Sequence, residues 1–132
     1  MPGAATNYLE AKLLDHALGT ASFTAPAAVY VGLFTDASGS APDTGPTSEV
    51  SGGAYLRQTA TFGAASGGSA STSLPITFPT ATANWGTITY IGIFDLVSGG
   101  NMLFYGEVTT AKVIETDDTF QISAGNLTVN LD

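Results

Sequence analysis

The chain has 132 residues, and eleven acidic side chains against three basic ones give it a net charge of −8 at pH 7. A chain this acidic cannot neutralise the phosphates of a nucleic acid and is repelled by an anionic membrane surface, which excludes both as partners. The sequence has no cysteine, which excludes disulfides and zinc–thiolate sites.

The length predicts one domain, residues 1–132, with a single hydrophobic core. Only 11% of the residues are charged, so we expect a surface made largely of hydroxyl and backbone groups. The N-terminal residues lack the basic and apolar regions of a secretory signal, and no run approaches the about 20 apolar residues of a membrane helix. We therefore expect a product made in a cytoplasm and not inserted in a membrane.

The first predicted element is a helix over residues 7–18. Asn7 stands at the capping position with Glu10 three residues further on, and Gly19 stands where the helix should end. The apolar residues recur at helical spacing and predict one stripe, formed by Leu9, Leu13, Leu14, Ala17 and Leu18. Two interpretations stay open. The helix closes one end of the fold, or it docks on a neighbouring subunit with Leu9 and Leu13 as candidate interface residues.

Short apolar, β-branched and aromatic runs separated by turn signals fill the rest of the chain. They predict strands over residues 27–35, 55–62, 74–78, 87–96, 102–108, 120–123 and 127–131, with a weaker eighth over 111–115. In the last of these, Leu127, Val129 and Leu131 alternate with polar residues and should point inward. The pattern predicts a mainly β fold, an antiparallel β-sandwich of seven or eight strands with one short N-terminal helix.

One five-residue pattern occurs twice. Residues 30–34 read YVGLF and residues 90–94 read YIGIF, so in each copy the aromatic residues and the glycine share one strand face and the aliphatic pair the other. The second copy begins a predicted hairpin over residues 87–108 that turns at 98–101. A glycine between two aromatics gives up β-propensity, so we expect Gly32 and Gly92 to make room for a neighbouring ring or backbone.

Two long segments have no strand or helix pattern, residues 36–48 and residues 63–73. Each is longer than the usual connection and is either flexible decoration or a contact arm that orders against a neighbouring subunit. Trp85 lies in the turn before the second copy of the repeated pattern. It is interpreted either as a plug of the core or as an anchor in a partner's pocket.

The sequence offers no set of catalytic residues. The single histidine, His16, has no nucleophile motif to serve, and no spacing selects a hydrolytic pair from Asp95, Glu107, Glu115, Asp117 and Asp118. The last three of these acids are oxygen ligands that calcium prefers, but they lack the alternating pattern of a calcium-binding loop, and a charged turn explains them better. We expect no enzyme, no cofactor and no metal.

The order of motifs carries a resemblance. NYLEAKLLDHALG is followed by VYVGLFT, EVSGGAYLRQ, FPTATANWGTITYIGIFD, SGGNMLFYGEV and a closing ISAGNLTVNLD. This order resembles a family of short proteins of tailed bacteriophages and prophages, usually labelled phage tail fibre protein. The resemblance covers nearly the whole chain and is most specific over residues 49–57 and 78–95.

The resemblance implies a non-enzymatic structural protein of the virion. Its partners would be other virion proteins, either tail or major capsid subunits, which it would bind in many copies, and we expect it to form a homo-oligomer. A tail fibre component and a capsid-decorating subunit both fit. The alternative from a different class is a carbohydrate- or receptor-binding module of a phage tail, whose signature would be several exposed aromatic residues on one face.

Overall fold

The computed structural model describes residues 3–131. These residues contain one helix, α1 (Asn7–Ala17), and nine strands. The strands are β1 (Gly3–Ala5), β2 (Val29–Phe34), β3 (Gln58–Ala60), β4 (Ser69–Ser71), β5 (Ile76–Thr77), β6 (Gly86–Phe94), β7 (Met102–Ile114), β8 (Gln121–Ile122) and β9 (Thr128–Asn130). The predicted mainly β fold with one N-terminal helix is confirmed, and the described strands outnumber the seven or eight that were expected.

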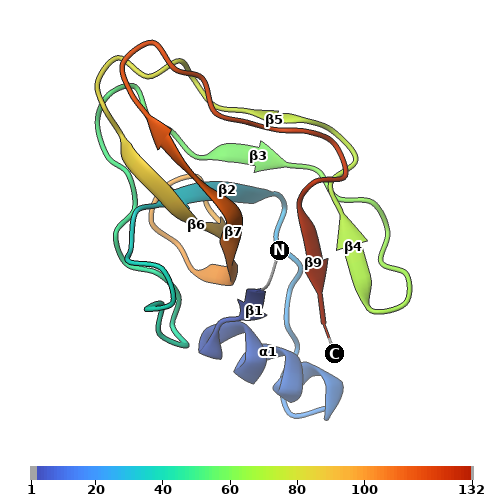
Figure 1. The fold of residues 1–132 in the computed structure, drawn as a ribbon. Coiled ribbons are helices and arrows are strands. Elements are labelled where there is room, and N and C mark those ends of the chain that lie inside the picture. Colours follow the sequence, from blue (N-terminus) through green and yellow to red (C-terminus); the bar gives the residue numbers. More distant parts are fainter. Residues whose placement is uncertain (1–2, 132) are drawn as a thin grey trace.

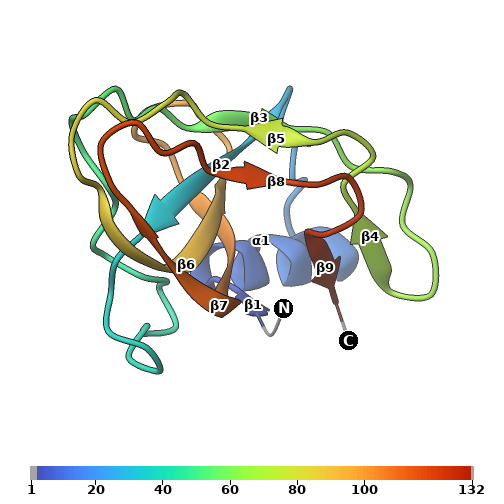
Figure 2. The same ribbon diagram turned by 45° about the horizontal axis from the view of Figure 1, so that its top comes forward.

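The strands form an antiparallel five-stranded sheet in the order β1-β7-β6-β2-β3 and two short ladders, β4–β9 and β5–β8 (Figure 1). The β5–β8 ladder lies across the larger sheet (Figure 2). The main core fills the space between the two layers. Ile76 and Ile122 of the ladder cluster there with Val31, Ile91 and Ile93 of the sheet.

The two copies of the repeated pattern are neighbours in the sheet. β2 and β6 run antiparallel with Gly32 directly opposite Gly92, so each copy is paired with the other about its own central glycine. The aliphatic residues of both copies enter the main core, as predicted. Phe34, Tyr90 and Phe94 form a second cluster on the opposite face of the sheet.

The central glycines do make room for rings. A Cβ atom at Gly92 would lie 2.9 Å from Cε1 of Phe34 and 3.1 Å from Cε1 of Phe94, and one at Gly32 would lie 3.1 Å from the same atom of Phe94. The rings of Phe34 and Phe94 stack with their centroids 6.0 Å apart. The predicted crowding is therefore confirmed at both positions.

Some predicted boundaries are wrong. The segments 102–108 and 111–114 belong to one strand, β7, whose register with β6 shifts so that residues 108–111 lie opposite Thr89. Residues 63–73, predicted to be a loop, contain β4, which pairs with β9 and so needs a partner far away in the sequence. In the last strand Leu127 is buried as predicted, but Leu131 is 53% exposed because the fold ends there without a covering layer.

The helix also departs from its prediction. Thr6, and not Asn7, is the N-cap, because its hydroxyl accepts from the Leu9 amide at 3.3 Å and donates to the Met102 carbonyl of β7 at 2.7 Å. At the other end Gly19, with φ of +80°, closes a Schellman motif in which the Thr20 amide donates to the Asp15 carbonyl, as its place predicted.

The single apolar stripe predicted on this helix is wrong. Leu9 is 3% exposed and Leu13 is half-buried, whereas Leu14 is 60% and Leu18 75% exposed. Because each residue turns the helix by about 100°, Leu14 and Leu18 point away from the side that carries Leu9. The helix therefore has a packed apolar face and a second apolar face that its own chain leaves open.

The loop over residues 36–48 is ordered against its own sheet. Its Ala41 packs on the cluster of Phe34, Tyr90 and Phe94, and the Gly39 amide donates to the Tyr90 hydroxyl at 2.7 Å. The Asp36 carboxylate closes the loop by accepting from the amides of Thr47 and Ser48. Burial raises the pKa of Asp36, but these hydrogen bonds outweigh it and hold that pKa below its usual value of 3.8.

We expect Gly92→Val to destabilise the fold more than Gly92→Ala, although valine is the better strand former. Alanine already pushes on the Phe34 ring, and each further methyl group adds overpacking, which typically costs about 1–3 kcal/mol. Urea midpoints of the two variants and the parent measure the order. A valine midpoint above the alanine midpoint would contradict the crowding that the structure shows.

We expect Asp36→Asn to loosen the loop over residues 36–48 while the urea midpoint of the whole chain changes little. The pKa of Asp36 is lower in the folded chain than its usual value of 3.8 in the unfolded chain. The carboxylate therefore stabilises the loop fully at a pH above 3.8, and this stabilisation is lost as the pH falls through the pKa of the folded chain. Amide exchange at Thr47 and Ser48 reports the change, corrected for the intrinsic effect of pH. Equal protection in the parent and the variant at pH 7 would show that the carboxylate does not hold the loop.

Candidate functional site

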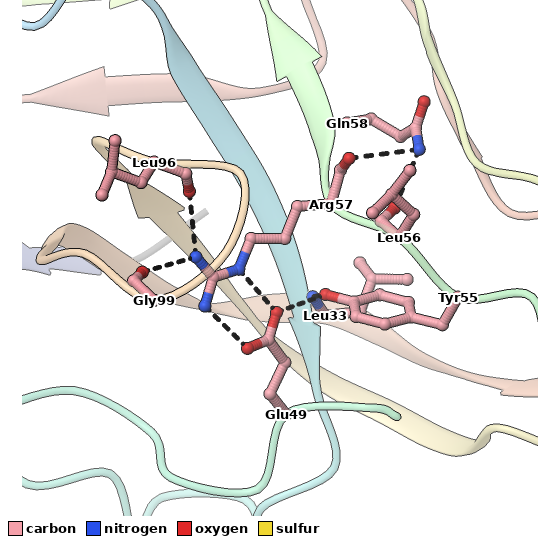
Figure 3. A network of polar contacts seen from close by, with 8 residues as sticks. All are labelled: Leu33, Glu49, Tyr55, Leu56, Arg57, Gln58, Leu96 and Gly99. Atoms are coloured by element: carbon pink, nitrogen blue, oxygen red, sulfur yellow. Dashed lines mark hydrogen bonds and ion pairs between the residues drawn. The ribbon is translucent and has the colours of Figure 1, made fainter. Parts of the chain in front are cut away.

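The most strongly built polar site lies on the same face of the sheet as the Phe34–Phe94 stack. Glu49 reaches it from the loop that runs back along β2, where Glu49 pairs with Phe34 and the Val50 amide donates to the Leu33 carbonyl. Three successive residues then adopt positive φ, at 75° for Gly52, 59° for Gly53 and 67° for Ala54. This tight turn returns the chain so that Tyr55 and Arg57 face Glu49 (Figure 3). We call Glu49, Tyr55 and Arg57 the arginine cluster.

The guanidinium of Arg57 forms a bidentate ion pair with the carboxylate of Glu49. Nε donates to Oε2 at 2.8 Å and Nη2 donates to Oε1 at 2.9 Å, while the Arg57 side chain is only 9% exposed. The Glu49 side chain is 25% exposed, so the pair is partly shielded from water. A paired, planar geometry of this kind is the one in which a shielded ion pair repays the loss of hydration.

Arg57 also fastens the turn between β6 and β7. Its Nη1 donates to the carbonyl oxygens of Leu96 at 2.9 Å and Gly99 at 2.8 Å (Figure 3). The plane of the guanidinium rests on the Phe94 ring, with Cζ 3.4 Å from the ring centroid. The Arg57 side chain, just before β3, therefore connects the loop that carries Glu49 with the β6–β7 turn, and we call these connected segments the rigid unit.

Tyr55 completes the cluster as a neutral phenol. Its hydroxyl donates to Oε2 of Glu49 at 2.6 Å and accepts from the Leu33 amide of β2 at 2.9 Å. Burial, followed by the hydrogen bond to Glu49, raises the pKa of Tyr55 far above its usual value of 10.0. A phenol held in this way keeps its proton at neutral pH, and its two hydrogen bonds join the loop that carries Glu49 to β2.

The rigid unit presents apolar groups to solvent. Leu56, Leu96 and Val97 are all exposed, and a hollow of about 300 Å³ lies between the segment 49–57 and the β6–β7 turn. Leu56 and Val97 line this hollow, with Ser51 and Ser98. We call Leu56, Leu96 and Val97 the loop surface. It combines exposed aliphatic side chains with a turn backbone that Arg57 holds by hydrogen bonds, and this combination suits contact with another protein.

The three residues predicted as interface candidates lie apart. Trp85 is 6% exposed in the main core, where Nε1 donates to the Gly53 carbonyl at 2.8 Å and the ring meets Tyr55 edge-on. Leu9 is buried on the packed face of α1, and Leu13, beside it, is half-buried. Within one chain Trp85 thus fills the core. That Leu9, Leu13 or Trp85 contacts another subunit stays a prediction.

Two of the candidate acids, Asp95 and Asp118, and the histidine make local hydrogen bonds. Asp95 accepts from the Asn101 amide in the β6–β7 turn, and Asp118 accepts from the Glu115 amide in a turn after β7. His16 accepts from the Phe23 amide through Nδ1 and so holds the chain that leaves α1. In residues 3–131, no group of three or more acidic or histidine side chains is placed to hold a metal ion.

Sequence reasoning missed the arginine cluster. Glu49 and Arg57 are eight residues apart and share no strand or helix, so no periodicity pairs them. The available signal was the scarcity of basic residues, because an arginine within a predicted strand of a chain with three basic side chains needs a partner.

Comparison with known families gives one finding. The sequence model of the family Gp80, described as podophage GP4 fiber I protein gp80, matches residues 4–130, nearly the whole chain. None of the curated proteins matches the chain.

We expect Arg57→Met to cost stability near the lower end of the about 3–5 kcal/mol that breaking a buried ion pair costs, because Glu49 keeps some contact with water. Methionine fills much of the space but leaves the Glu49 carboxylate with the Tyr55 hydroxyl as donor and without its cation, and leaves two turn carbonyls without their donor. Urea unfolding measures the loss, and Lys112→Met removes an exposed positive charge as the matched control. Equal midpoints for the two variants would mean that the cluster does not hold the fold.

Proposed function

The chain belongs to the podophage GP4 fiber I protein gp80 family, and from this premise we propose that it is a non-enzymatic fibre subunit that binds other virion proteins in many copies. Membership of this family makes it a bacteriophage fibre protein with a structural role. The observation that carries the proposal is the family match over residues 4–130. Exposed apolar side chains support the proposed contact with other virion proteins.

The surface favours contacts with proteins. Its large exposed apolar side chains are aliphatic, and among them are Leu56, Leu96 and Val97 of the loop surface. Such groups gain free energy when a partner removes them from water, at about 25 cal/mol per Å² of apolar area. The loop surface is also fixed beforehand by Arg57, so little ordering entropy is lost when a partner binds. We propose that the loop surface is one site of contact with a neighbouring virion protein.

The fibre is the proposed location within the virion, in preference to the capsid. The sequence leaves a tail component and a capsid-decorating subunit equally open, and the description of the matching family favours the fibre. No helix in the described part of the chain is long and apolar enough to cross a membrane. We further propose that residues 1–132 act as one domain, because one main core joins residues from β2 through β8.

A carbohydrate-binding module is the weaker candidate. Its signature is a set of exposed aromatic side chains on which sugar rings stack. In this chain every aromatic side chain is buried or half-buried, and the stacked pairs lie in the core or under the arginine cluster. The aromatic residues thus stabilise the fold, and we propose protein contacts in place of sugar contacts.

A reconstruction of phage particles that carry a tagged copy of this chain tests the location. Density for the tag on the tail fibres is expected, with a copy number close to that of other tail proteins. Tag density spread over the capsid lattice, at a copy number close to that of the major capsid protein, would overturn the proposed location.

We expect the double variant Leu96→Asp, Val97→Asp to lower the amount of this chain in purified particles by about tenfold or more, because each carboxylate must be desolvated at the contact. Both side chains are exposed, so the urea midpoint should change little. Leu74→Asp, an equally exposed leucine elsewhere, is the matched control and should be incorporated normally. Normal incorporation of the double variant would remove the loop surface from the proposal.

A further inference from the structure

The open face of α1 carries a regular apolar ridge. Ala11, Leu14 and Leu18 follow one another at spacings of three and four residues, which places them in one row along the helix. All three are exposed, and Leu18 is the most exposed large apolar side chain in the described part of the chain. We call these three residues the ridge. Helices that pack against other elements carry such a row, and here its own chain does not cover it.

An apolar groove lies between the β4–β9 ladder and the five-stranded sheet. Its volume is about 370 Å³, within the range of about 300–1,000 Å³ that binding pockets occupy. Val29, Phe62, Ala65, Ala70, Phe104 and Leu131 are among the lining residues, none of which is charged and none of which comes from α1. The groove is open because the short β4–β9 ladder covers this part of the sheet without filling the space beneath it.

We propose that the ridge of one copy packs into the groove of a second copy of this chain. The inference rests on the proposed function, since it concerns how fibre subunits join one another. It assigns the homo-oligomer contact to Leu14 and Leu18 on one side and to the groove beside Ala65 and Leu131 on the other.

A second copy fits the groove better than an unrelated partner for three reasons. The chain itself carries the convex apolar element that matches its own concave one, so a single sequence supplies both halves of the contact. Both features lie at the same end of the molecule, where α1 and the β4–β9 ladder are found in both views (Figures 1 and 2). Neither half carries a charge, which matters because two copies with a net charge of −8 repel each other at long range.

The contact joins two different surfaces and is therefore of the head-to-tail kind. Such contacts close into rings or continue as open chains, according to the rotation between copies. Added salt screens the repulsion between copies and should strengthen the association, the opposite of its effect on a contact made by ion pairs.

Engineered disulfides test the pairing directly, because the natural chain has no cysteine. The purified full chain is prepared as Leu18→Cys, as Ala65→Cys and as the double variant with both changes, and each is oxidised over a range of protein and salt concentrations. Both positions are exposed, so neither change disturbs the core. Leu74→Cys with Ala65→Cys is the matched control, with an equally accessible thiol away from the ridge.

Covalent oligomers from the Leu18→Cys, Ala65→Cys variant, with none from the Ala65→Cys variant or the control pair, are the expected result. Efficient cross-linking of Leu18→Cys alone would show that ridge meets ridge, and would overturn the proposal. A second, independent test is the double variant Leu14→Ser, Leu18→Ser. It should raise the dissociation constant of the oligomer, measured by sedimentation, by about tenfold or more.

A parent chain that sediments as a monomer at every concentration and salt level would also overturn the inference. That outcome leaves the proposed function standing if the same chain is still found on the fibres of phage particles. Absence of the chain from particles, together with intact cross-linking in solution, would instead overturn the proposed function alone.

Discussion

The structure depends on the position of the Phe94 ring beside two glycines and an arginine. Gly32 and Gly92 lie directly opposite each other in the sheet, and a side chain at either would meet the ring. The Arg57 guanidinium lies 3.4 Å from the centroid of the same ring. The glycines give up β-propensity so that the ring can lie against the backbone, and the flat ring then provides the surface on which a nearly buried cation can rest.

The arginine site follows from this arrangement. Gly32 leaves space for the Glu49 carboxylate as well as for the ring, since a Cβ there would lie 2.8 Å from Oε2. The carboxylate and the carbonyls of the β6–β7 turn then accept from the guanidinium, and the phenol of Tyr55 donates to the same carboxylate. In residues 3–131, no buried side-chain polar atom is left without a partner. The charged groups of this site are thus used in contacts that hold the loops around the sheet.

Local patterns in the sequence predicted the helix, seven strand segments, the hairpin and the crowding at the glycines, because each depends on residues close together in the chain. The failures all depend on distant partners. β4 forms because β9 lies beside it. Thr6 is held at the helix cap because its hydroxyl donates a hydrogen bond to the Met102 carbonyl of β7. Leu14 is exposed because only one side of α1 meets the sheet. The arginine cluster joins residues 49, 57, 96 and 99, and no short-range pattern records such a meeting.

The scarcity of charge links this interior to the surface. Of three basic side chains, Arg57 is committed to the fold and Lys12 lies near the Tyr8 ring, 5.7 Å from its centroid, so few cations remain to pair with a partner's acids. Copies of this chain can therefore form few ion pairs with one another, and the net charge of −8 opposes their approach. The proposed contact between copies would then depend on aliphatic groups, hydroxyls and backbone, which act only at short range. Such a contact would be favourable only where apolar surfaces match closely in shape.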